Sequence, residues 1–574
     1  MSNLNEIVKN IKNKNFDQAL NLCKIYQNNK NKHIIFNFTG VIYFSQNNLD
    51  RAEINFLNSF KISDIFVDPI KNLILIYNRK KNFKKFLFFA KKLVDIDKEN
   101  PQFNFQLGYA FGENHNYKKA IKYYKKCINL DQKYKYMVFN NMGSIYARIQ
   151  KYKISNKYYV RSLKHNKNNK IVVNNILSNF IELRDEKNAH TYFQKAKNFD
   201  QNDIQFLYYK AEYFFLIGKI DKAIEILEKE KNNLRFLIRL TEIYFILGKN
   251  KEGQLLFNSS KEKFLQDSKG INFLGMRLLY EGDFINGWKY YQKESIKLEN
   301  LFQNIKEWGG ENIEKKHIVV FNEQGLGDAI QFSKYIFPLL KISHKVTFIV
   351  KQNIHKIFRS DIPNLKIETF ATLQDYKFDF KIDLGSLIKF FYKKDIKSNT
   401  LIVNNKEKLT DLDFKKFNKS KLNVGIAWSG SLNGPNEPFR SIPLKSLNKI
   451  FSLDINYYCL QNEIWERDLI DFNSIKINNL GKYSLNEMTS IIPNLDLVIS
   501  SDTSLLHLSS SLNKETWGIL NLYPDWRWGE FNKINPYNSL KLFHQKIFNK
   551  WDDVEFEILE NLKEKLKEKD LNNK

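Results

Sequence analysis

Cysteine is scarce in this chain, and its placement excludes two classes of protein. The three cysteines, Cys23, Cys127 and Cys459, lie far apart among the 574 residues. Disulfide frameworks and structural zinc sites both need several cysteines at close, regular spacing. We therefore expect neither a disulfide-stabilised fold nor a zinc-binding protein.

Proline and long apolar runs are also scarce. Ten prolines in the whole chain argue against long disordered linkers. The most apolar stretches, such as residues 86–94, are short and interrupted by lysine, so no membrane-spanning segment is expected. The first ten residues are polar and lack the apolar core of a signal peptide. These features predict a cytoplasmic protein in a reducing compartment.

Acidic residues are too few to balance the basic ones, and the formal net charge is +28. Residues 1–300 carry 52 basic and 29 acidic side chains, whereas residues 301–574 carry 39 and 34. The basic half could attract a protein partner, a nucleic acid or a membrane surface. The alternative is compositional drift toward lysine on solvated helix faces. No zinc-finger spacing or aromatic-interleaved basic motif is present, so nucleic-acid binding is not expected.

The chain has enough length and apolar content for several domains. A chain of 574 residues with 43% hydrophobic residues exceeds the size of a single core. Three or four domains are expected.

A short motif, as in NFDQA or NYKKA, recurs through the first half. Its last residue falls at 19, 52, 86, 120, 155, 189, 223, 253 and 287, a spacing of 33, 34, 34, 35, 34, 34, 30 and 34. A small residue often precedes it by twelve positions, with an aromatic three residues later, as at Gly108 and Phe111. The pattern resembles tetratricopeptide repeats over residues 1–296 and predicts an α-solenoid. Its concave surface would bind an acceptor or a partner protein, or the repeats would be a spacer.

Alternating strand and helix patterns replace the repeat after a polar joint at 301–316. Strands are predicted at 317–321, 346–350 and 379–384, and again at 422–428, 455–460 and 495–499, with a charged linker at 406–421 between the two sets. This alternation is typical of doubly wound sheets. It predicts two Rossmann-like domains, 317–415 and 420–550, facing each other across a cleft. A helix at 551–574 is expected to pack back across the first of them.

The stretch 495–512 combines a buried strand, a polar turn and a helix. Helix N-termini at this place in an α/β sheet favour an anion, most often a phosphate. Asp502, Thr503, Ser504 and His507 would supply the side chains around it. In the alternative interpretation, Asp502 only caps the helix and His507 is a packed histidine.

Four motifs in the second half give a specific resemblance. They are NEQGLGDAIQF at 322–332, GIAWSGS with NEPFRSIPL at 425–444, SSDTSLLHL at 500–508 and YPDWRW at 523–528. The region 308–550 resembles glycosyltransferase family 9, the heptosyltransferase-like enzymes, in the bacterial branch that carries tetratricopeptide repeats. It departs from related sequences at Gly434, where they often have histidine, and at Glu515, where they usually have proline.

The resemblance implies a GT-B fold and sugar transfer with inversion, without a metal. The donor would be a nucleotide sugar, which is a substrate, so no cofactor is expected. The acceptor would be a glycan, a lipid-linked saccharide or a protein. The alternative function is a non-catalytic repeat scaffold whose degenerate transferase domain serves protein interaction.

The resemblance also assigns roles to residues. Asp328 is the expected catalytic base; its alternative role is to cap the following helix. Arg440 would pair with phosphate or, alternatively, with Glu437, and Gln461 would touch the base or ribose or only shape a turn. Two Asp-x-Asp tripeptides, 95–97 and 411–413, are read as solvated. The expected donor and diphosphate ligands are Ser429, Gly430, Arg440, Gln461, Asp502, Thr503, Ser504 and His507. The expected cleft loops contain Gly325, Gly327, Asp525 and Arg527, although Trp526 and Trp528 would equally fill a domain interface.

Overall fold

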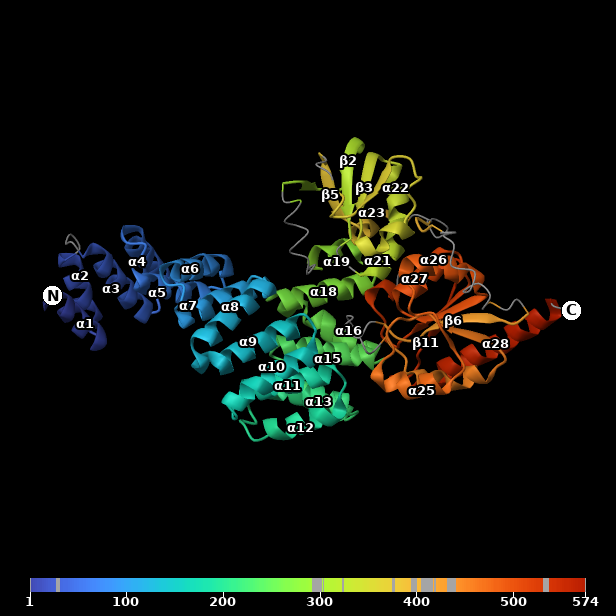
Figure 1. Cartoon of the computed structure of the whole chain (residues 1–574), viewed down its shortest axis with the longest axis horizontal. Helices are drawn as coiled ribbons and strands as arrows, with labels where there is room; N and C mark the ends of the chain where they lie inside the picture. The colour runs from blue at the N-terminus through green and yellow to red at the C-terminus, as the bar shows by residue number, and fades with distance from the viewer. Residues whose placement is uncertain are drawn as a thin grey trace. The chain divides into compact units, whose positions relative to one another are not determined.

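The computed structural model describes residues 2–26, 31–291, 302, 304–322, 325–373, 377–393, 400–403, 417, 420–430, 440–529 and 536–572. The chain divides into two compact units, Met1–Ala223 and Ile224–Lys574. The first is helical, and the second combines helices with two parallel sheets (Figure 1).

The first unit consists of paired helices, as the repeat pattern predicts. They are α1 (Ser2–Lys12), α2 (Phe16–Ile25), α3 (Lys32–Ser45), α4 (Leu49–Ile62), α5 (Val67–Arg79), α6 (Phe83–Ile96), α7 (Pro101–Glu113), α8 (Tyr117–Leu130), α9 (Lys135–Arg148), α10 (Tyr152–His165), α11 (Lys170–Glu182), α12 (Glu186–Ala196) and α13 (Ile204–Leu216). Asn48, Asn82 and Asn116 accept a backbone N–H at the start of α4, α6 and α8. An asparagine therefore caps the second helix of the pair in three successive repeats.

The turns inside the helix pairs repeat with the spacing of the sequence motif. Backbone φ is positive at residues 14, 47, 81, 115, 150, 184, 218, 248 and 282. The last three are glycines, for which this left-handed conformation is least costly. Because each turn lies five residues before a motif end, the motif marks the start of the second helix.

Small residues let the paired helices approach closely, but the ring that packs against them is not the aromatic three residues later in the sequence. A Cβ added at Gly108 would lie 2.7 Å from the ring of Tyr124, and one at Gly143 would lie 2.5 Å from Tyr159. These rings come from the second helix, sixteen residues on. The aromatic three residues after the glycine has another partner, since Phe111 stacks on Tyr123 instead.

The helical pattern continues into the second unit. Helix α14 (Ile220–Lys229) spans the division, and α15 (Leu234–Ile246), α16 (Asn250–Ser259), α17 (Lys261–Phe264), α18 (Ser268–Tyr280) and α19 (Phe284–Tyr290) follow. In Figure 1 these are the green helices before the first sheet.

The first sheet has five parallel strands in the order β1-β5-β2-β3-β4. They are β1 (Lys306–Glu307), β2 (Ile313–Phe321), β3 (Ser343–Ile349), β4 (Leu365–Glu368) and β5 (Phe380–Asp383). Helices α21 (Leu326–Phe332), α22 (Ile336–Leu340) and α23 (Ile388–Phe391) accompany it. The three predicted strands correspond to β2, β3 and β5.

The second sheet has six parallel strands in the order β11-β10-β9-β6-β7-β8. They are β6 (Asn423–Ala427), β7 (Asn456–Cys459), β8 (Asn478–Asn479), β9 (Leu497–Ser501), β10 (Thr516–Leu520) and β11 (Leu540–His544). The helices α25 (Leu469–Ser474), α26 (Leu485–Ile491), α27 (Ser504–Ser511) and α28 (Asp552–Asn572) complete the domain. Together with the repeats, the two doubly wound sheets confirm the predicted fold class.

Strand order locates the ligand-binding edge of each sheet. The order in which successive strands are added to the sheet reverses between β2 and β5 in the first sheet and between β6 and β9 in the second. Loops diverge at such points and leave a crevice beyond the carboxyl ends of the strands. The loops carrying Asp328 and Asp502 follow β2 and β9, so both start at these points.

The C-terminal helix α28 packs on the second α/β domain, not across the first as expected. Val554, Ile558 and Leu562 are fully buried in the core of the second sheet. Lys449 donates its backbone N–H to Glu555 at 2.8 Å. The four-residue spacing puts these apolar side chains on one side of α28. The helix contacts the 3₁₀ segment Leu444–Ser452.

Candidate functional site

Helices α21 and α27 meet at their N-termini. A Cβ added at Gly327 would lie 3.0 Å from Cδ2 of His507 and 3.6 Å from the Cα of Ser504. The absence of a side chain at Gly327 therefore permits this close approach. It brings the loop after β2 against the loop after β9, one from each sheet.

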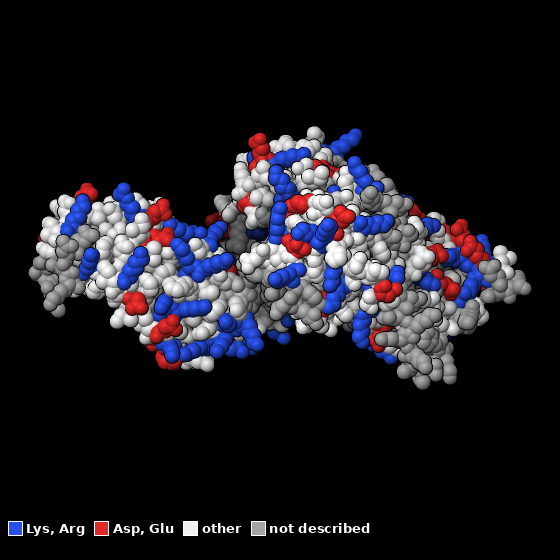
Figure 2. Space-filling view, turned by 90° about the horizontal axis from the view of Figure 1, so that it is seen from above, with Lys and Arg blue, Asp and Glu red and all other residues white. Residues whose placement is uncertain are grey.

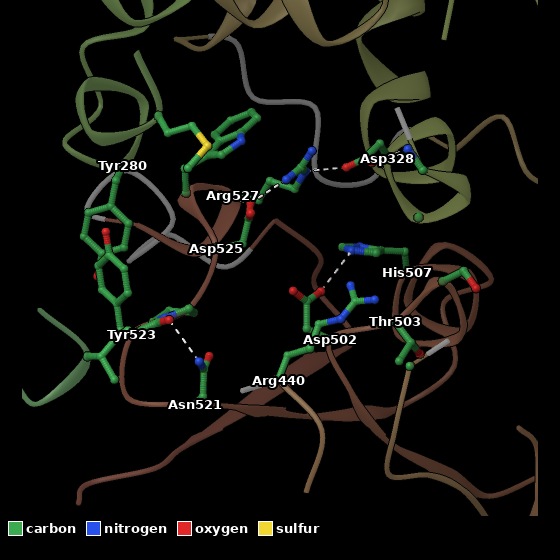
Figure 3. Close-up of a pocket in the computed structure, with 18 of the residues that line it drawn as sticks. Tyr280, Asp328, Arg440, Asp502, Thr503, His507, Asn521, Tyr523, Asp525 and Arg527 are labelled. Atoms are coloured by element: carbon green, nitrogen blue, oxygen red, sulfur yellow. Dashed lines mark hydrogen bonds and ion pairs between the residues drawn. The ribbon is translucent and has the colours of Figure 1, made fainter. Parts of the chain in front are cut away.

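A cavity of about 580 Å³ lies at this junction (Figure 3). Three parts of the second unit line it. From the first α/β domain come Gly325, Leu326, Gly327, Asp328 and Lys351. From the second come Gly430, Arg440, Asp502, Thr503, Ser504, His507, Asn521, Tyr523, Pro524, Asp525, Trp526 and Arg527. From the repeat helices α15 and α18 come Arg239, Glu242, Ile246, Phe273, Met276, Arg277 and Tyr280.

Asp328 both caps its helix and faces the cavity. Its Oδ2 accepts the backbone N–H of Gly325 at 2.7 Å, and its Oδ1 forms an ion pair with Nε of Arg527. Nη1 of Arg527 is 2.5 Å from Oδ1 of Asp525 (Figure 3). The side chains of Asp328 and Arg527 are only 13% and 14% exposed, so the ion pair is largely shielded from water.

The charge of Arg527 is maintained by its neighbours. Burial alone would lower the pKa of this guanidinium, but Asp328 and Asp525 outweigh it and raise the pKa. Arg527 therefore places a fixed positive charge between two carboxylates at the cavity wall.

Asp502 and His507 form the other charged group of the cavity. Nε2 of His507 lies 3.6 Å from Oδ1 of Asp502, and Nδ1 of His507 is 3.1 Å from the hydroxyl of Tyr537. Burial would raise the pKa of the Asp502 carboxyl, but His507 and Arg440 lower it below its usual value. In Figure 3 the Arg440 guanidinium lies beside Asp502. Asp502 is thus held as a carboxylate next to two basic side chains.

Thr503, not Asp502, caps helix α27. Its Oγ1 accepts the backbone N–H of Leu505 at 3.3 Å and lies 3.0 Å from Oγ of Ser500. Asp502 therefore does not fill the capping role proposed as its alternative. Ser504 begins the helix and, like Thr503, lines the cavity.

Three of the residues expected to bind the sugar donor, Ser429, Gly430 and Gln461, form hydrogen bonds within the protein. Oε1 of Gln461 accepts the backbone N–H of Trp428 and of Ser429, and its Nε2 donates to Oγ of Ser429 at 2.9 Å. Gly430 donates its N–H to Ser441 at 3.1 Å. Among the described residues, Gly430 lines the cavity, and Gln461 and Ser429 do not. The geometry favours the alternative role of Gln461, which is to hold the turn after β7 against the end of β6.

The two tryptophans of the YPDWRW motif are packed against other rings. Trp526 stacks on Phe332 of the first α/β domain with ring centroids 5.8 Å apart, and Trp528 stacks on His507 at 5.5 Å. Both are buried. The interpretation as a domain interface therefore holds for Trp526, which also contributes to the cavity wall, whereas Trp528 packs inside the second α/β domain.

The repeat helices contribute residues that the sequence reasoning missed. The ring of Tyr523 stacks on Phe245 of α15 at 5.5 Å and lies 5.5 Å from Tyr280 of α18. Burial raises the pKa of the Tyr523 hydroxyl to about 12, against an opposing effect of Arg277, so this hydroxyl stays a neutral donor. Arg277 is 7% exposed. A charged side chain in the apolar run 273–280 was the signal available in the sequence.

Some predictions fall outside the described residues. They concern Gly434, the tripeptide 411–413 and most of the linker 406–421. Glu437 also lies outside them, and with it the alternative pairing of Arg440. In the part of the chain that the structure describes, no group of three metal-ligating side chains is found. No helix there is both long and apolar enough to cross a bilayer.

Two family models match the chain. The model of glycosyltransferase family 9 (heptosyltransferase) matches residues 460–554, and that of the tetratricopeptide repeat matches residues 101–134. The chain thus joins tetratricopeptide repeats to a family 9 glycosyltransferase domain, as the motifs predicted. The first match includes the Asp502–His507 loop and Arg527, whereas Asp328 and Arg440 lie outside it.

Solved structures similar to the chain include three with partial coverage. One is PilF of Pseudomonas aeruginosa, with 17% identity over 35% of this chain and 90% of that one and a TM-score of 0.30. A tetratricopeptide repeat protein from Parabacteroides merdae has 12% identity over 40% and 93%, with a TM-score of 0.36. PilW, a type IV pilus biogenesis factor, has 17% identity over 38% and 99%, with a TM-score of 0.33. A search of the curated proteins gives no match.

Proposed function

We propose that the protein is an inverting glycosyltransferase that moves a sugar from a nucleotide-activated donor to an acceptor hydroxyl without a metal. The observation that carries this proposal is the shared cavity. The carboxylate of Asp328 and the Asp502–His507 loop line one space at the switch points of two doubly wound sheets. The family 9 match supports the class of reaction.

The donor diphosphate would lie at the N-terminus of α27. Free backbone N–H groups and the positive end of the helix dipole favour an anion there. Thr503 and Ser504 add hydroxyls, and Arg440 adds a planar guanidinium that suits phosphate oxygens. These groups would stabilise the charge that develops on the diphosphate as it leaves.

Asp328 would be the general base. Its carboxylate takes the proton of the acceptor hydroxyl while that oxygen attacks the anomeric carbon from the side opposite the diphosphate. The new glycosidic bond forms as the bond to the diphosphate breaks, so a single displacement inverts the configuration. Arg527 would orient the carboxylate through its ion pair.

The acceptor would enter along the repeat wall of the cavity. Helices α15 and α18 contribute the aromatic side chains Phe273 and Tyr280 and the charged side chains Arg239 and Glu242. Aromatic faces and hydrogen-bonding groups of this kind suit a sugar or a polar chain. We infer that the repeats take part in acceptor binding, and that the acceptor is a glycan, a lipid-linked saccharide or a protein.

A thermal-shift screen of the full chain against nucleotide sugars and nucleoside diphosphates tests the proposal. A ligand that binds only the folded protein raises the melting midpoint by mass action. We expect a shift with one nucleotide class, and its loss when Thr503→Val is combined with His507→Ala. The matched control combines Thr191→Val with His165→Ala, both on exposed helix faces of the repeats.

Two outcomes contradict the proposal. If no nucleotide shifts the folded protein, the alternative of a non-catalytic scaffold replaces it. If the shift persists unchanged in the Thr503 and His507 variant, the diphosphate does not bind at α27.

A further inference from the structure

In three successive repeats, the outward side of the second helix is mostly basic. These helices are α6, α8 and α10. Positions 2, 3, 6, 9 and 10 of each helix point away from the core, as the exposed residues among them show. Because repeats stack in register, these positions fall on the same side of successive units. We call this set of fifteen residues the basic face. It consists of Lys84, Lys85, Phe88, Lys91, Lys92, Lys118, Lys119, Lys122, Lys125, Lys126, Lys153, Ile154, Lys157, Val160 and Arg161.

The charge of the basic face is not explained by compositional drift. Twelve of its fifteen residues are cationic, and none is acidic. The same positions of α2, α4 and α12 in the same unit carry four basic and two acidic residues. Drift toward lysine would affect all six helices alike. The excess is therefore a property of one surface, and Figure 2 shows basic side chains gathered over the repeat helices.

Acidic side chains neutralise part of this charge, and Asp95 lines the same hollow as Lys91 and Lys122. Lys85 pairs with Glu53 at 3.1 Å, and Lys126 pairs with Glu99 at 2.8 Å. Both pairs are partly exposed to solvent, where an ion pair contributes little. The twelve cations outnumber these acidic groups, so a net positive potential is left to attract an external anion.

The three remaining positions of the basic face are apolar and exposed. Phe88, Ile154 and Val160 are 51%, 37% and 39% exposed. Exposed apolar side chains surrounded by lysine are typical of surfaces that lie in the headgroup region of a bilayer. The apolar groups insert among the lipids, while lysine stems extend their charges to the headgroups.

Lysine predominates over arginine on the basic face, as it does in the whole chain, and this is compatible with a membrane; the exposed apolar side chains are what favour a membrane over a nucleic acid. Eleven of the twelve cations are lysines. Lysine is a compact point charge, whereas the arginine fork suits specific pairing with phosphate oxygens. A bilayer surface with mobile anionic headgroups needs only point charges of the kind that lysine supplies.

We propose that the basic face docks the protein on a bilayer surface that contains anionic lipid. Among the acceptor classes above, docking favours a lipid-linked one. That consequence rests on the proposed function, whereas the docking itself does not.

Vesicle co-sedimentation of the full chain tests the docking. We expect binding to vesicles of phosphatidylcholine mixed with phosphatidylglycerol, little binding to phosphatidylcholine alone, and weakening at high salt. Each lysine at an anionic surface contributes about fivefold to binding. Combining Lys118→Gln, Lys122→Gln, Lys125→Gln and Lys157→Gln should lower binding at least about tenfold. A control variant removes the same charge elsewhere and should bind as the native chain does. It combines Lys24→Gln, Lys61→Gln, Lys187→Gln and Lys222→Gln.

A second variant distinguishes a membrane from a soluble polyanion. Phe88→Ser with Ile154→Ser leaves the charge intact, so it should weaken vesicle binding and leave binding to heparin unchanged. The proposal is overturned if the four-lysine variant and its control bind vesicles equally. It is also overturned if the Phe88 and Ile154 variant binds vesicles as tightly as the native chain. Circular dichroism melting checks that all variants, which change exposed side chains, remain folded. Because no sugar donor is needed, failure here leaves the glycosyltransferase proposal standing.

Discussion

Replacing Asp328 by alanine tests both the stability and the chemistry of the cavity. The change removes the acceptor for the Gly325 N–H and one of the two carboxylates that pair with Arg527. Breaking a buried ion pair costs about 3–5 kcal/mol when the remaining charge has no partner. Arg527 keeps Asp525 at 2.5 Å, so a lower cost is expected. We predict that the free energy of unfolding falls by about 2–3 kcal/mol.

The effect on transfer should be larger than the effect on binding. Loss of a general base lowers the rate about 100- to 10,000-fold. Nucleotide affinity should be kept or increased, because a negative charge near the diphosphate is removed. Asp328→Asn separates the two effects, since its amide oxygen can still accept the Gly325 N–H but the amide cannot act as a base. Initial rates at saturating donor and denaturant unfolding measure the two quantities.

Asp361→Ala is the control for the stability measurement. Its bidentate pair with Arg359, at 2.9 and 3.0 Å, is exposed to solvent, and such pairs contribute little to stability. If Asp328→Ala lowers the free energy of unfolding no more than Asp361→Ala does, the reasoning about the shielded ion pair is refuted. A fully active Asp328→Asn enzyme would refute the assignment of the base.

Two further predictions concern a repeat interface and the diphosphate loop. Gly108→Ala should lower the free energy of unfolding by about 1–3 kcal/mol, because the new Cβ would lie 2.7 Å from the Tyr124 ring. Gly112→Ala in the same helix, with its nearest contact at 3.8 Å, should be neutral or stabilising, and equal effects in denaturant unfolding would contradict the packing argument. Asp502 has a lowered pKa, so it stabilises the fold at neutral pH and loses this effect as pH falls through that pKa. The melting midpoint of Asp502→Asn should therefore lie below the native one at pH 7 and approach it as pH falls through the usual aspartate range and below it; a constant difference would exclude this linkage.

The fold was largely predictable because its signals are periodic. A motif recurring every 34 residues located each turn, and the structure places a positive φ five residues before each motif end. Strand patterns located most strands of the two sheets. Periodicity shows that a helix has an apolar stripe, but it does not show which domain that stripe packs against. Helix α28 could not be assigned to one α/β domain, because its valine, isoleucine and leucine would suit any apolar groove.

The site was predictable where one motif holds several ligands. Asp502, Thr503, Ser504 and His507 lie within six residues and line one cavity. Gln461 shows the limit of this reasoning, since its amide is engaged by Ser429 and Trp428. An amide beside a strand end suits either a ligand or a turn, and only the contacts decide. The basic face was hidden for a related reason, because half-chain charge totals do not resolve helix faces.

The last repeats are structurally part of the α/β unit. Leu279, Phe284 and Trp288 lie in the same hydrophobic core as the first sheet and Trp526. A Cβ at Gly385 would lie 2.8 Å from the Trp288 ring, and one at Gly529 would lie 2.2 Å from the carbonyl oxygen of Tyr280. Contacts this close leave no space for a hinge between these helices and the sheets. A detachable spacer would not share a core with its enzyme or contribute to the wall of its cavity. The repeat helices that line the cavity with Asp328 are therefore better understood as part of the candidate site, and a chain cut at residue 296 would lose both that wall and a share of the core.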